Sequence, residues 1–132
     1  LEVLEALNID GIDGGEAILL AVLSENPNYR LLSGERRMLE ALHSSADPRL
    51  VRLREAVRGR VLTFPQVIAR LVKELSLRVV EDRVRSGLCR HKTLRILFGS
   101  KRPTDPDHFR EAYESEMRSY LSLCGEGWLF SL

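Results

Sequence analysis

The chain has 132 residues, of which 44% are hydrophobic and 30% charged, a balance typical of a soluble globular domain. Its length predicts one domain, residues 1–132, with a core of its own. No apolar stretch approaches the ~20 residues of a membrane span, and the acidic, amphipathic start lacks the pattern of a secretory leader. We therefore expect a cytoplasmic protein with no membrane partner, whose Cys89 and Cys124 stay reduced.

The formal net charge of +1 hides a strong asymmetry along the chain. Residues 51–102 hold 14 Lys and Arg against four Asp and Glu, whereas the flanking segments are net acidic. Most of these basic residues are arginines, whose forked guanidinium groups suit phosphate. Two interpretations stay open: arginines on solvated helix faces that pair with the acidic ends, or a surface for nucleic acid.

The first half of the chain alternates helical and extended patterns. A short helix is expected over residues 1–7. Asp13 is an N-cap with Glu16 three residues on, and it opens a helix whose residues 17–23 are apolar nearly all round, so this helix should be buried on more than one face. Turn residues 26–28 end it, and residues 29–32 read as a strand.

A second helix-rich stretch follows this strand. Ser33 is expected to cap a helix with Gly34 and Glu35 in its first turn, and Asp47 with Pro48 begins the next. Residues 61–64 read as a second strand. Because helical segments separate the two strands, a parallel pair is favoured, and the fold class is α/β, helix-rich with a small parallel sheet.

The remaining chain is helical. Apolar residues recur at helical spacing from Pro65 to Leu75, over 79–84 and over 94–98. Residues 103–132 form a helical C-terminal extension with an aromatic stripe, followed by Trp128, Leu129 and Phe130. Docking on the core is the favoured role of this tail, and a homo-oligomer interface through the C-terminal helix is the alternative.

The order of these motifs resembles that of PIN-like domains. Asp13-Gly14-Gly15-Glu16-Ala17 is similar to their Gly-Glu-Ala helix start, and Ser33-Gly34-Glu35 to the Thr/Ser-Gly-Asp that follows a strand. The segments around Gly59, Gln66 and Lys92–Gly99 resemble the tail of a bacterial PIN-like group. The resemblance covers about residues 9–100.

The resemblance implies a ribonuclease that depends on Mg²⁺ or Mn²⁺ and gathers acidic ligands at one end of a parallel sheet. Glu16 and Glu35 match catalytic acids of the family, and Asp13 is a third metal-ligand candidate. Hard divalent cations prefer such carboxylate oxygens. Position 35 holds Glu where the family has Asp, and the aspartate that ends the family's first strand has no counterpart, so the expected site is incomplete.

Local roles also explain these acids without a metal. Asp13 and Glu16 have the spacing of a capping box, and a carboxylate in a first helical turn, such as Glu35, is favoured by the helix dipole. The second hypothesis is therefore a non-enzymatic module that keeps the fold and binds nucleic acid or protein. Candidate RNA contacts under either hypothesis are basic: Arg36, Arg37, Arg58, Arg60, Arg90 and Lys92.

Other groups of residues give weaker indications of function. Cys89, His91, His108 and Cys124 lack the paired spacing of structural zinc sites. Cys89 and His91 are two residues apart, so on a helix they would face different sides and could not act as a nucleophile and base. The glycines form no phosphate loop.

Overall fold

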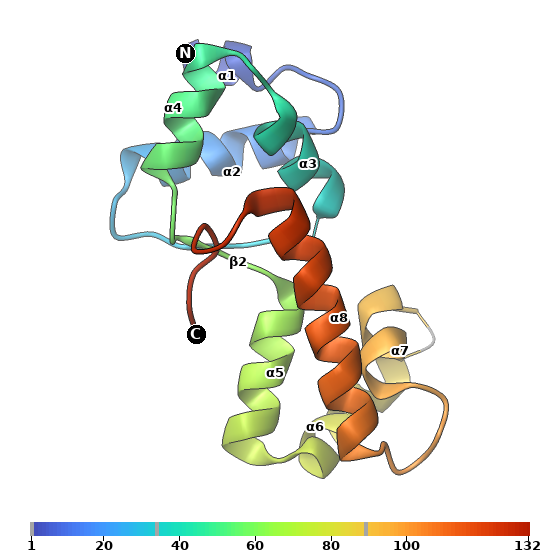
Figure 1. Cartoon of the computed structure of the whole chain (residues 1–132). Coiled ribbons are helices and arrows are strands. Elements are labelled where there is room, and N and C mark those ends of the chain that lie inside the picture. Colours follow the sequence, from blue (N-terminus) through green and yellow to red (C-terminus); the bar gives the residue numbers. More distant parts are fainter. Residues whose placement is uncertain (1, 34, 89) are drawn as a thin grey trace. The chain divides into compact units, whose positions relative to one another are not determined.

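The computed structural model describes residues 2–33, 35–88 and 90–132 (Figure 1). The chain divides into two compact units, which are described separately. Unit 1 comprises Leu1–Thr63 and Tyr120–Ser131, and unit 2 comprises Phe64–Ser119 with Leu132. The prediction of one domain, PIN-like over about 9–100 with a helical extension over 103–132, stays a prediction.

Unit 1 contains the sheet, and the predicted helix-rich α/β class with a small parallel sheet is confirmed. β1 runs parallel to β2, with Leu31 opposite Val61 and Leu32 opposite Leu62. Both strands are shorter than the sequence predicted, because only two residues of each pair in the ladder. The first stretch of this unit contains, in chain order, α1 (Glu2–Ala6), α2 (Gly14–Glu25), β1 (Leu31–Leu32), α3 (Arg36–Ser44), α4 (Pro48–Ala56) and β2 (Val61–Leu62).

Unit 2 is helical. The prediction of a strand through Phe64 is wrong in its last residue, since a helix begins there and accommodates Pro65 in its first turn, where proline costs no hydrogen bond. The core gathers side chains from four helices, among them Ile68, Val80, Leu97 and Phe109. The elements are α5 (Phe64–Leu75), α6 (Leu77–Val84), the 3₁₀ turn Arg85–Gly87, α7 (Lys92–Phe98) and α8 (Pro106–Cys124), whose last turn belongs to unit 1.

A buried carboxylate ties two segments of unit 2 together. The Glu81 side chain accepts hydrogen bonds from the Thr104 backbone N–H at 3.2 and 3.1 Å and from the Thr104 hydroxyl. Burial by itself raises the pKa of Glu81, but the bonds from Thr104, with Arg85 and Arg102 nearby, outweigh it and hold that pKa below its ordinary value. The ionised carboxylate therefore fixes the loop before α8 to α6.

The C-terminal tail docks within unit 1, as predicted. Trp128 is buried, its Nε1 donates to the Arg54 carbonyl at 2.9 Å, and its own carbonyl accepts from Gly59 N–H at 2.6 Å. The Phe130 N–H donates to the Val61 carbonyl at 2.8 Å, so the tail follows β2 (Figure 1). In α8, Phe109 and Tyr120 are buried, so much of the aromatic stripe packs inside the chain.

Two further expectations concern cysteine and membranes. Cys124 is buried, and burial raises the pKa of its thiol to about 11, so it stays protonated and unreactive at neutral pH. Cys89 lies outside the described residues. None of the helices in the described part of the chain is long and apolar enough to cross a bilayer.

His43 lies under the docked tail in a setting that disfavours its charge. Its ring meets Trp128 edge-on at 4.3 Å between centroids, and within the described residues its buried Nε2 has no hydrogen-bond partner. Burial, followed by the positive charges of Arg54 and Arg58, lowers its pKa from 6.5 to about 4. Between pH 6.5 and about 4, His43 is therefore neutral in the folded protein but protonated in the unfolded chain.

We expect His43 to make the protein less stable as the pH falls. Between pH 6.5 and about 4 the unfolded state binds a proton that the folded state does not, so His43's contribution is complete above 6.5 and declines towards 4. Because the ring is only half-buried, the expected loss is about 1–2 kcal/mol. The measurement is the difference in unfolding free energy between wild type and His43→Phe at pH 7 and pH 4.5. An equal difference at both pH values would contradict the prediction.

Candidate acidic pocket

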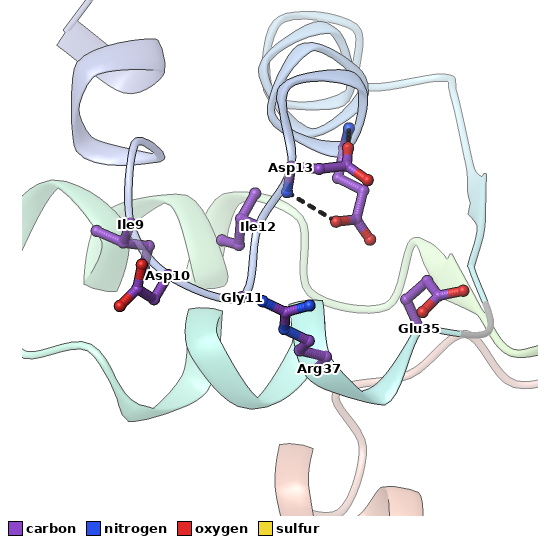
Figure 2. Close-up of a pocket in the computed structure, with 8 residues that line it drawn as sticks. Ile9, Asp10, Gly11, Ile12, Asp13, Glu35 and Arg37 are labelled. Carbon is purple, nitrogen blue, oxygen red and sulfur yellow. Dashed lines mark hydrogen bonds between the residues drawn. The ribbon is translucent and has the colours of Figure 1, made fainter.

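The first two predicted acids form the capping box that opens α2. The Glu16 N–H donates to Asp13 Oδ1 at 2.8 Å, and the Asp13 N–H donates to Glu16 Oε1 at 2.9 Å. Figure 2 shows the second of these bonds beside the labelled Asp13. One oxygen of each carboxylate thus satisfies an N–H at the helix start, and the other oxygen of each takes part in neither bond.

Glu35 reaches the same region from the end of β1. The Ser33 N–H donates to the Leu62 carbonyl at 2.8 Å, so Ser33 continues the extended pairing with β2. α3 begins at Arg36, with Glu35 in the N-cap position and no side-chain bond to the helix. The prediction that Ser33 caps this helix, with Glu35 inside its first turn, is wrong for that reason. Gly34 lies outside the described residues.

One pocket of about 470 Å³ brings the three predicted acids together. It is lined by the loop Ile9–Ile12 and by Asp13, Glu16, Glu35 and Arg37 (Figure 2). Residues from the start of α2 and from the end of β1 therefore line one opening. Pockets at the carboxyl ends of parallel strands are common ligand sites in α/β proteins.

Asp10 is a fourth carboxylate in this pocket, and the sequence reasoning missed it. Gly11, the next residue, has φ +96°, and a Cβ there would lie 2.9 Å from the Ala41 Cβ and 3.2 Å from the Arg37 carbonyl oxygen. Only glycine lets the loop approach α3 this closely. A glycine directly after the acid was the signal in the sequence, but only the structure shows that Asp10 lines the pocket.

The pocket is strongly acidic. Four of its lining residues carry carboxylates, and Arg37 is the single basic residue among the lining residues that the structure describes. Carboxylate oxygens are the donor type that Mg²⁺ and Mn²⁺ prefer. Over residues 2–33, 35–88 and 90–132, no three His, Cys, Asp or Glu side chains are grouped closely enough to hold an ion.

A second, apolar pocket adjoins the acidic one. It has a volume of about 220 Å³ and shares Glu16 and Glu35 with its neighbour, while its other walls are largely aliphatic: Leu19, Leu31, Leu32, Ser33 and Met38. The two shared carboxylates therefore stand between a polar opening and an apolar one.

The six basic candidates have different surroundings. Arg37 is exposed at the acidic pocket, and the Arg36 guanidinium lies 4.8 Å from the centre of the Tyr120 ring. Arg58 donates twice to Glu55 at 3.1 Å, and these bonds lower the pKa of that carboxyl. Arg90 and Lys92 are exposed in unit 2.

Arg60 holds a structural position. Its guanidinium donates to the carbonyls of Leu23 at 2.9 Å, Asn26 at 2.7 Å, Tyr29 at 3.3 Å and Ala56 at 2.9 Å. It thereby links the C-terminal end of α2, the turn that follows this helix and the last turn of α4. These bonds occupy both terminal nitrogens of the guanidinium.

Comparison of the chain with protein-family models, with curated proteins and with solved structures finds no match.

Proposed function

We propose that the chain is a PIN-like module that binds Mg²⁺ or Mn²⁺ in the acidic pocket and cleaves RNA there. The observation that carries the proposal is the pocket itself, whose lining includes the four carboxylates of Asp10, Asp13, Glu16 and Glu35. The order of motifs that resembles PIN-like domains supports it independently of the structure. A bound divalent ion supplies polarised water and neutralises phosphate charge.

The residues have distinct roles in this proposal. Glu35, which is exposed and makes no capping bond, is the principal ligand. Glu16 contributes Oε2, the carboxylate oxygen that is not used in the capping box. Asp13 and Asp10 add negative charge. Because Asp10 and Glu35 are exposed, their side chains can rotate towards an ion without disturbing the core. Arg37 contacts the phosphate.

The test separates metal binding from helix capping. Glu16→Gln keeps a side-chain oxygen for the Asp13 N–H but removes the charge, so the helix survives while Mn²⁺ affinity falls. We expect Glu16→Gln and Glu35→Gln each to reduce Mn²⁺-dependent cleavage of single-stranded RNA by at least about 100-fold, the order of loss seen when one member of a catalytic site is removed.

The matched control is Glu40→Gln, an exposed carboxylate on α3 that does not line the pocket. It should cleave like the wild type. Metal binding is followed separately by titration calorimetry with Mn²⁺ alone. Wild-type cleavage that survives in Glu35→Gln, or that proceeds equally in EDTA, contradicts the proposal.

A second candidate is a non-enzymatic binding module. The observation that favours it is that several of the candidate residues already serve the fold: Asp13 and Glu16 form the capping box of α2, and Arg60 binds backbone carbonyls. Such a module binds RNA through exposed Arg37, Arg90 and Lys92, or it binds protein. RNA affinity that falls steeply with salt, with no cleavage in Mn²⁺ or Mg²⁺, supports this candidate over the first.

A further inference from the structure

The outer face of α2 is apolar and uncovered. Ala17, Leu20 and Leu23 pack inward, but Ile18, Leu19 and Val22 are 58%, 53% and 43% exposed. Their spacing places them on one stripe of the helix. The prediction that this helix is buried on more than one face is therefore not met within the chain. An apolar stripe of this kind is typical of a surface that another protein segment covers.

The edge of β1 lies beside this stripe. The Leu31 N–H donates to the Arg60 carbonyl and the Ser33 N–H to the Leu62 carbonyl. Because backbone groups alternate along a strand, the N–H and C=O of Leu32 point away from β2. Neither group has a hydrogen bond to any residue that the structure describes. The Leu32 side chain is 52% exposed and lines the same apolar pocket as Leu19, so the apolar surface continues from helix to strand.

Opposite charges flank the open edge. Arg30 directly precedes β1 and Glu35 follows it shortly after, and both are exposed. The Arg30 guanidinium lies over the Phe130 ring at 4.4 Å, which restrains it beside the strand. A strand that is basic at its beginning and acidic beyond its end is complementary to itself when two copies run antiparallel.

We propose that two copies of this chain pair through β1 and α2. The strands run antiparallel about a two-fold axis at Leu32, whose N–H and C=O bond to those of Leu32 in the second copy. Arg30 of each copy then approaches Glu35 of the other. The stripes formed by Ile18, Leu19 and Val22 cover the pocket beside the joined strands. This interface does not use the C-terminal helix and does not depend on the proposed nuclease activity.

The first experiment measures mass by sedimentation velocity of the whole chain, without metal or RNA, over about 1–200 µM. We expect a dimer in the wild type and a dissociation constant at least about tenfold higher in Leu19→Glu, because a charge in an apolar interface is costly. Leu71→Glu is the control, since Leu71 is an exposed leucine of unit 2, 40% accessible. Circular dichroism and a melting curve confirm that each variant is folded.

A charge exchange tests the antiparallel register. Arg30→Glu alone leaves both flanks acidic, and Glu35→Arg alone leaves both basic, so each single variant should dimerise at least about tenfold more weakly. Mixed in equal amounts, the two variants should form a heterodimer in which each charge again faces its opposite. The double variant should dimerise like the wild type.

Three outcomes overturn the proposal. A wild type that stays monomeric at every concentration shows that two copies do not pair through this face. A dimer that persists unchanged in Leu19→Glu places the interface elsewhere. Single charge variants that dimerise as tightly as the wild type, or fail to combine when mixed, exclude this register. None of these outcomes bears on cleavage of RNA, so failure here is distinct from failure of the proposed function.

Discussion

Replacing Trp128 with alanine is expected to lower the free energy of unfolding by about 3–5 kcal/mol. The indole is 1% exposed, and it fills the space between α4, β2 and the ring of His43. Truncation leaves a cavity and leaves the Arg54 carbonyl without the Nε1–H donor. The loss is measured by urea denaturation followed by circular dichroism, with the midpoint and slope both fitted.

Two further variants separate the effect of the lost volume from that of the lost hydrogen bond and provide a control. Trp128→Phe keeps most of the apolar volume and loses the bond to Arg54, so it should cost about 1–2 kcal/mol. Glu126→Ala, in an exposed part of the same tail, should stay within about 0.5 kcal/mol of the wild type. If Trp128→Ala is as stable as Glu126→Ala, the tail is not part of the cooperative core of unit 1.

Replacing Arg60 with methionine is expected to cost about 2–4 kcal/mol, because carbonyls of α2, its following turn and α4 lose a charged donor together. Arg60→Lys should recover part of this loss, since an ammonium reaches some of these oxygens but lacks the planar fork that reaches all of them. Thermal and urea unfolding measure both variants.

Arg58→Met is the matched control, because Arg58 is a neighbouring arginine in an exposed ion pair with Glu55, and its loss should destabilise the protein much less than the loss of Arg60. If Arg60→Met loses RNA affinity while retaining wild-type stability, then Arg60 is a nucleic-acid contact after all. Equal stability losses in Arg58→Met and Arg60→Met would instead contradict the role of the four carbonyl bonds.

Local rules predicted much of unit 1. The pair Asp13 and Glu16 was identified as a capping box from spacing alone, and both reciprocal bonds are present. Asp47 with Pro48 opens α4 as expected, with the Asp47 side chain accepting from Arg49 N–H at 2.9 Å. These features depend on residues within one turn of each other, so the sequence contains all that determines them.

Non-local contacts account for what the sequence did not reveal. Arg60 was grouped with surface arginines, but its partners in α2 and the following turn lie 31 to 37 residues away. Asp10 lines the acidic pocket beside Gly11, which packs on α3 more than 25 residues further along the chain. The apolar run over residues 17–23 predicted a helix that is apolar nearly all round, but it did not show that the chain leaves Ile18, Leu19 and Val22 uncovered.

The composition of unit 1 from two separated stretches of chain has a consequence for biosynthesis. Residues 64–119 stand between β2 and the tail that covers it. Trp128 and Leu129 are therefore made after the rest of the core that they complete, and this core forms only when a long intervening segment of chain has been closed into a loop. Until the tail has emerged from the ribosome, the Val61 edge and His43 stay uncovered. The nascent chain is then most open to proteases and most in need of chaperones.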